Sequence, residues 1–215
     1  NEYERLQFRF GGQQAESDAN AAFFLFAFIV GIFLMSIILM VQLNSFYQVF
    51  IIVSAVILST AGVQLGYLVT QQIYSDLFTS LGIIALAGIV VNNNIVLVDT
   101  FNVITKENPN LSREQIVIRT AAQRLRPIIL TTATTVIGLL PLASGIGVDF
   151  YQRNIEIGGR VSEWWQPMSF AVVCGLTFAS AITLFLTPCW LMLPVAIKDT
   201  FNNLKNSFLK AASER

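Results

Sequence analysis

Three adjacent amides, Asn92, Asn93 and Asn94, and the carboxylate of Asp99 interrupt an otherwise apolar stretch of the sequence. Amides of this kind act without covalent chemistry, by hydrogen bonding to a charge or dipole that another helix brings. Polar side chains in hydrocarbon are costly and usually have partners. Because successive residues of a helix point about 100° apart, the three amides cannot all face one neighbour. For a single amide, hydrogen bonding that joins helices is an equally good explanation, whereas the cluster favours a functional role.

Hydroxyl side chains gather in a second apolar stretch, at Thr131, Thr132, Thr134 and Thr135. A threonine hydroxyl can bond the carbonyl four residues before it, so a structural role is the simpler explanation for each one. Facing hydroxyls and amides would nonetheless form a hydrated track through a helix bundle. No Asp, Glu, Lys or Arg lies deep in any apolar stretch. This chain by itself therefore has no group that could bind and release a proton in mid-membrane.

The elements that must position these groups are five apolar stretches, each long enough to cross a bilayer. The sequence is 54% hydrophobic and 12% charged, with a mean hydropathy of +0.64. A bilayer core of about 30 Å requires roughly 20 apolar residues in a helix. The predicted spans are residues 21–43, 49–69, 77–98, 128–146 and 168–197. The predicted fold class is an all-α membrane protein, built as a five-helix transmembrane bundle with a short extramembrane segment at its N-terminus.

Three prolines lie near the limits of these spans. Pro127 suits the first turn of the fourth span, where its missing N–H is not needed. Pro188 and Pro194 predict a kink or an early end of the fifth span.

Charge sets the expected orientation of the bundle. If the N-terminus is outside, nine of the 13 Lys and Arg residues fall on the inner side, as the excess of positive charge in cytoplasmic loops requires. Residues 198–215 are then a cytoplasmic tail, and Trp164 and Trp165 are interfacial anchors on the outer face. Residues 1–20 are expected to end an extramembrane domain, because residues 3–10 alternate in the manner of a strand and Gly11 and Gly12 follow.

The longest inner segment contains a helix signal. Ser112 and Gln115 have the spacing of a capping box, which predicts a helix over residues 112–125. Two placements remain open for this helix: an interfacial helix with its basic residues near anionic head groups, or a solvated connector.

Composition excludes several classes of function. The chain has no histidine, which removes Ser-His and Cys-His nucleophile pairs and the HExxH zinc helix. Its formal net charge of zero leaves no basic surplus for nucleic-acid binding. Cys174 and Cys189 fall on one predicted helix, about 22 Å apart, so they cannot form a disulfide with each other.

Three sequence segments together resemble one transporter family. Gly88-Ile-Val-Val-Asn92-Asn93-Asn94-Ile-Val-Leu-Val-Asp99 is followed by Arg124-Leu-Arg-Pro127-Ile-Ile-Leu-Thr131-Thr132 and then by Gly138-Leu-Leu-Pro141. Their order and spacing resemble the resistance-nodulation-division (RND) efflux transporters. The five spans are similar to the last five of the twelve transmembrane helices in that family.

The resemblance implies a pump of the bacterial inner membrane, with the N-terminus periplasmic. It implies several partners: the N-terminal half of the same transporter, two further copies in a homotrimer, a periplasmic adaptor and an outer-membrane channel. The proton-motive force would drive it, without a cofactor or metal. By position, Asn92 matches a lysine that pairs with acidic residues of the other half, and Asn93 matches an adjacent amide. Arg124 matches an arginine at the cytoplasmic mouth, and Thr131 matches a threonine that faces the proton-relay residues of the family. The asparagine at position 92 departs from the pattern and leaves the coupling ion open.

The first hypothesis is therefore the C-terminal membrane part of a proton-driven permease that exports hydrophobic or amphiphilic compounds. The alternatives are a protein-export accessory of the same superfamily and a non-catalytic helical assembly unit. An intramembrane enzyme is disfavoured, because the chain lacks paired membrane aspartates, a Ser-His pair and metal ligands.

Overall fold

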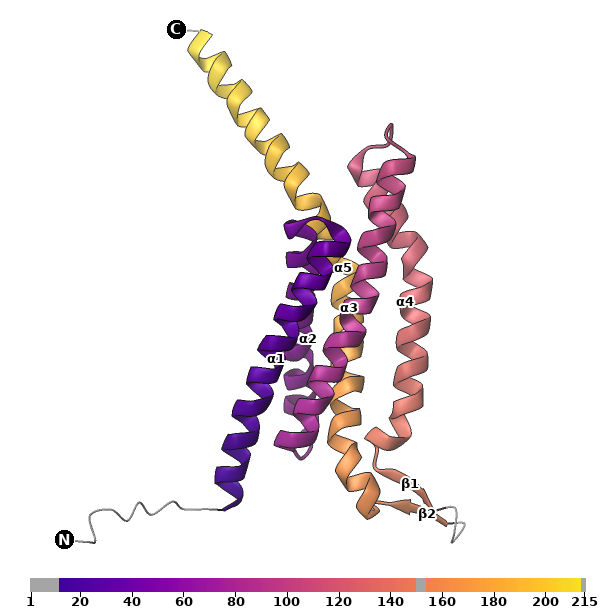
Figure 1. Cartoon of the computed structure of the whole chain (residues 1–215). Coiled ribbons are helices and arrows are strands. Elements are labelled where there is room, and N and C mark those ends of the chain that lie inside the picture. Colours follow the sequence, from indigo (N-terminus) through magenta and orange to yellow (C-terminus); the bar gives the residue numbers. More distant parts are fainter. Residues whose placement is uncertain (1–11, 150–153, 214–215) are drawn as a thin grey trace, which may run out of the picture.

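The computed structural model describes residues 12–149 and 154–213. Five long helices lie side by side and alternate in direction along the chain (Figure 1). In order they are α1 (Gln13–Leu43), α2 (Phe46–Thr70), α3 (Asp76–Glu107), α4 (Arg113–Ala143) and α5 (Arg160–Ser213). All five are long and apolar enough to cross a membrane. The predicted fold class, an all-α membrane bundle, is confirmed.

One element was not predicted from the sequence. Between α4 and α5, strands β1 (Ile146–Asp149) and β2 (Asn154–Ile157) form an antiparallel hairpin, with Ile146 opposite Ile157. The start of α1, the α2–α3 link and this hairpin lie at the same end of the bundle, which we call the hairpin end (Figure 1). The α1–α2 link and the α3–α4 link lie at the opposite end.

Local signals explain where the helices begin and end. Asn44 ends α1 in a left-handed conformation, and Ser45 then caps α2 by accepting a hydrogen bond from the backbone N–H of Gln48. The predicted capping box at the start of α4 is confirmed, with Ser112 and Gln115 each bonding the other's backbone. The orphan amides at these helix ends are thus partly satisfied by side chains.

The helices extend beyond the predicted spans, most of all α4 and α5. Residues 113–125 are not a separate helix but the first turns of α4, which continues through Pro127. Ile116, Val117 and Thr120 of these turns are buried within the bundle. The missing N–H of Pro127 removes the helical partner of the Gln123 carbonyl, and Gln123 is an exposed residue.

The fifth helix also passes through its prolines. α5 begins before the predicted span and continues beyond Pro188 and Pro194 to Ser213. Both cysteines are free and lie on this one helix, as expected. The predicted strand over residues 3–10 lies outside the described residues, and residues 13–20 are already part of α1.

Helix α5 packs against α2, α3 and α4 and so organises the core. Glycines permit close approach at these contacts, as small residues do between membrane helices. A Cβ at Gly62 would lie 2.5 Å from Phe178, and one at Gly82 would lie 2.8 Å from the carbonyl oxygen of Met168. The rotation of α3 about its axis is therefore set by tight contacts with α5.

Candidate functional site

Of the three adjacent amides, Asn94 is buried between α3 and α5. Its side chain is 0% exposed. The Nδ2 group donates to the carbonyl of Val90 at 2.9 Å and to the hydroxyl of Thr183 at 3.3 Å. Its Oδ1 accepts from the hydroxyl of Thr187 at 3.0 Å. Both donors and one acceptor site of this fully buried amide are thus used, so Asn94 joins two helices.

Asn92 faces away from these contacts. It belongs to a row of exposed α3 residues with helical spacing, which we call the open stripe: Leu77, Leu81, Ala85, Gly88, Asn92, Val96, Asp99 and Val103. Asn93 is half-buried beside the stripe. Within the described part of the chain, Asn94 is the only one of the three amides whose side chain forms hydrogen bonds. The hydrogen-bonding groups of Asn92 thus remain available.

The α4 threonines also differ in their hydrogen-bond partners, and three of them bond only carbonyls of their own helix. The hydroxyl of Thr131 donates to the carbonyls of Pro127 and Ile128 in its own helix, each at 3.0 Å. Those of Thr134 and Thr135 also bond carbonyls of α4. Thr131 is exposed, so its oxygen can still accept a hydrogen bond from outside this bundle.

Thr132 differs from the other α4 threonines because it reaches another helix. Its hydroxyl lies 2.6 Å from that of Ser180 on α5. The bond joins α4 to α5 through a pair of neutral hydroxyl groups.

Arg124 lies where α4 meets α3 near the opposite end. Its Nε donates to the hydroxyl of Thr100, the residue that follows Asp99. Asp99 itself is exposed on the open stripe. No hydrogen bond among the described residues joins Asn92 or Asn93 to Thr131 or Arg124. The structure therefore places the four predicted site residues on the two neighbouring helices α3 and α4 without linking them directly.

The opposite end contains polar contacts that were not predicted from the sequence. Gln48 of α2 and Asn102 of α3 exchange two amide hydrogen bonds, at 2.6 and 3.0 Å. The hydroxyl of Tyr47 donates to the carbonyl of Trp190 on α5. Together these bonds tie α2 to α3 and α5 near one end of the bundle.

The α5 partners could have been found from their spacing. Ser180, Thr183 and Thr187 are three and four residues apart, so they lie along one face of a helix. All three are buried. A row of hydroxyls at this spacing in an apolar span is the signal for partners of the α3 amides and α4 hydroxyls.

The sequence profile of the AcrB/AcrD/AcrF family matches residues 4–194, which is most of the chain. The chain belongs to this family. The AcrB/AcrD/AcrF family is a family of RND efflux transporters, so the resemblance inferred from the sequence segments is confirmed.

Individual relatives of this AcrB/AcrD/AcrF family member include multidrug resistance proteins. It is 34% identical over 134 residues to multidrug resistance protein MdtC of Citrobacter koseri, covering 61% of this chain and 12% of the relative. It is 31% identical over 156 residues to MdtC of Yersinia pseudotuberculosis, covering 71% and 13%.

Two solved structures have a fold similar to that of this chain. Crystal form I of a heavy metal efflux pump aligns with a TM-score of 0.62 and 27% identity, covering 89% of this chain and 18% of that chain. Crystal form II aligns with a TM-score of 0.60 and 28% identity, covering 75% and 15%. The chain thus spans less than a fifth of the length of each of these relatives.

Proposed function

We propose that this chain is the C-terminal membrane part of a proton-driven RND efflux permease that exports hydrophobic or amphiphilic compounds across the bacterial inner membrane. Its partners are then the N-terminal half of the transporter, two further copies in a trimer, a periplasmic adaptor and an outer-membrane channel. The support is the family match over residues 4–194 together with the placement of the polar residues on α3 and α4.

The observation that carries the proposal is the contrast between Asn94 and Asn92. Asn94 is buried and bonded to two hydroxyls of α5, whereas Asn92 lies on the open stripe without a side-chain partner among the described residues. An amide transferred into hydrocarbon without hydrogen bonds costs roughly 2–7 kcal/mol. Such a residue is expected to meet a polar or charged group on another helix. The carboxylates of the N-terminal half are suitable partners, because an amide N–H donates readily to an anion.

The remaining predicted residues act around the same helix. Asn93, half-buried beside the stripe, supplies a second amide to the relay. The free lone pair of the Thr131 oxygen accepts a hydrogen bond from a protonated carboxyl group and loses that bond when the proton leaves. Arg124 fixes the α3–α4 contact through Thr100 and supplies positive charge near the cytoplasmic mouth. Protonation of the carboxyl group then forms a hydrogen bond that is made in only one conformer of the transporter. Such a difference shifts the equilibrium between conformers and so couples proton binding to movement.

The membrane orientation is part of the same proposal. The N-terminus and the hairpin end face the periplasm, and the α3–α4 link and the C-terminus face the cytoplasm. Cysteines introduced at Lys106 and Ser144, both exposed, test the orientation in intact cells. A membrane-impermeant maleimide should label position 144 only, and labelling of position 106 instead would reverse the topology.

Paired threonine variants of the full-length parent test the relay. Thr131→Ala removes a hydroxyl proposed to bond a protonated, neutral carboxyl group, and such bonds contribute about 0.5–1.5 kcal/mol. Export is expected to fall by about two- to tenfold at unchanged membrane level. Thr134→Ala is the matched control, because Thr134 is equally exposed and also bonds its own backbone. Equal effects of the two substitutions would exclude a relay role for Thr131.

A further inference from the structure

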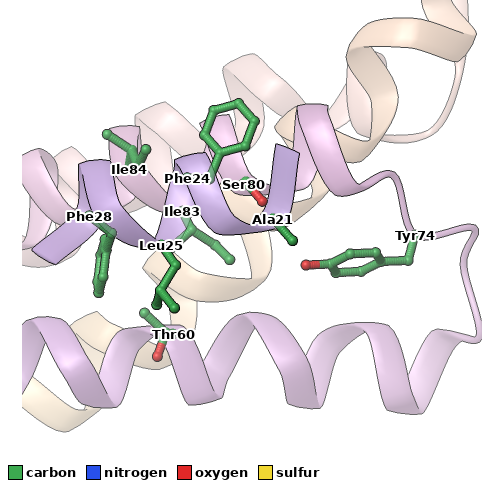
Figure 2. Close-up of a pocket in the computed structure, with 9 residues that line it drawn as sticks. All are labelled: Ala21, Phe24, Leu25, Phe28, Thr60, Tyr74, Ser80, Ile83 and Ile84. Atoms are coloured by element: carbon green, nitrogen blue, oxygen red, sulfur yellow. The ribbon is translucent and has the colours of Figure 1, made fainter. Parts of the chain in front are cut away.

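A groove runs between α1 and α3 near the hairpin end. Its deeper part is a pocket of about 300 Å³ lined by residues of α1 and α3, with Thr60 of α2 and Tyr74 of the α2–α3 link (Figure 2). A second pocket of about 270 Å³ lies around the first turns of α1 and α3. Tyr74 lines both pockets, so the two adjoin.

The lining residues form continuous rows on both helices. On α1, the second pocket is lined by Glu16, Ser17 and Asn20, and the deeper pocket is lined by Ala21, Phe24, Leu25 and Phe28. On α3 the corresponding rows are Asp76 and Leu77, then Ser80, Ile83 and Ile84. Twelve residues of helix separate Glu16 from Phe28, which makes the groove about 18 Å long. This length suits one extended alkyl chain with its head group.

The two ends of the groove differ in charge. Glu16 and Asp76 provide two carboxylates at the polar end, and no Lys or Arg is among its described lining residues. Each carboxylate lies in the first turn of its helix, where the helix dipole favours negative charge. The hydroxyl of Ser17 donates to Asp76 and holds α1 against α3 at this point. One oxygen of Asp76 remains available to a ligand.

The deeper end is apolar and aromatic. Figure 2 shows Phe24, Leu25 and Phe28 along α1 opposite Ile83 and Ile84 of α3, with Tyr74 at the end near Ala21. An alkyl chain there packs against these apolar and aromatic side chains by van der Waals contact. An anionic head group would be repelled by the two carboxylates, and the phosphate of a diacyl phospholipid would meet the same repulsion.

We propose that the groove between α1 and α3 is a binding site for single-chain amphiphiles with a cationic head group. The head lies between Glu16 and Asp76, and the chain lies along Phe24, Phe28 and Ile83. This site is separate from the relay residues on the open stripe. The proposed function specifies neither the charge of a ligand nor this location.

Photo-crosslinking of the full chain in phosphatidylcholine nanodiscs tests the site. The probe is an alkyl trimethylammonium that carries a diazirine at the end of its chain, and its counterpart is the alkyl sulfate with the same chain. The cationic probe is expected to label peptides that contain residues 24–28 and 80–84, at least about tenfold more than the sulfate. Binding is measured without a proton gradient, so the result is independent of whether export is proton-driven.

Matched variants test the charged end and the apolar end of the groove separately. Glu16→Gln with Asp76→Asn should lower labelling by the cationic probe about tenfold, whereas Asp18→Asn, on the same turn but outside the groove, should not. Ala21→Phe fills the groove and should abolish labelling.

Ala22→Phe adds the same ring at an exposed neighbouring position that does not line the groove, and labelling should persist. Equal labelling by the two probes, or equal effects of the paired variants, would overturn the proposal. So would labelling by a diazirine phosphatidylcholine that the cationic probe fails to displace.

Discussion

Gly82 and Gly88 lie on the same helix, yet the structure predicts opposite effects for adding one methyl group. A Cβ at Gly82 would lie 2.8 Å from the carbonyl oxygen of Met168 and 3.0 Å from Cβ of Ala171. At Gly88 no atom lies within 4 Å of the added Cβ. Both residues are within α3, so the change in helix propensity is the same for Gly82→Ala and Gly88→Ala.

The magnitudes follow from these distances. Ordinary contact begins near 3.4 Å, so at Gly82 the backbones of α3 and α5 must separate locally by about 0.6 Å. Overpacking of this kind costs about 1–3 kcal/mol, whereas replacing glycine by alanine within a helix gains at most about 1 kcal/mol. Gly82→Ala should therefore lower the free energy of unfolding by about 1–2 kcal/mol. Gly88→Ala should leave it unchanged or raise it by up to about 1 kcal/mol.

Reversible unfolding of the 215-residue chain in mixed micelles, followed by circular dichroism and by tryptophan fluorescence, measures both variants. A second measurement is the distance between spin labels on α3 and α5, which should increase only for Gly82→Ala. If Gly82→Ala proved as stable as Gly88→Ala with an unchanged distance, close backbone packing would not set the position of α3.

Three further predictions concern the amides. Asn94→Leu should lower the free energy of unfolding of the chain by about 1 kcal/mol, since it removes hydrogen bonds between α3 and α5. Asn92→Leu, on the open stripe, should leave this free energy unchanged, and equal losses would show that Asn94 does not join the two helices. A double-mutant cycle of Gln48→Ala and Asn102→Ala should give a coupling energy of about 0.6–1.7 kcal/mol, and simple additivity would refute their pairing. In the full-length parent, Asn92→Lys should move the pH profile of export to lower pH, because a nearby cation favours ionised carboxylates; an unmoved profile would show that Asn92 does not face them.

Hydropathy alone was enough to locate the five helices, because each span is a long apolar run bounded by polar residues. The capping box at Ser112 was equally readable, since it depends only on residues three apart. Whether α4 and α5 continue through Pro127 and Pro188 was not predictable in this way. A proline removes one local hydrogen bond, but helix packing along the whole of α4 and α5 decides whether the helix continues.

The candidate site was predictable in part. The sequence requires that Asn92, Asn93 and Asn94 face different surroundings, because they are successive residues of one helix. It does not show which of them is buried, since that depends on the rotation of α3 against α5. Tight packing around Gly82 and Gly175 fixes this rotation, and Asn94 is the amide that then meets Thr183 and Thr187. The roles of Asn92, Asn93, Thr131 and Arg124 stay predictions.

The bonds of Asn94 have a mechanical consequence for any movement of the bundle. Turning α3 about its own axis would break its contacts with both Thr183 and Thr187 at once, with no replacement partner in hydrocarbon. These bonds therefore favour movement of α3 and α5 together, because turning α3 alone would cost about 1 kcal/mol in lost hydrogen bonds.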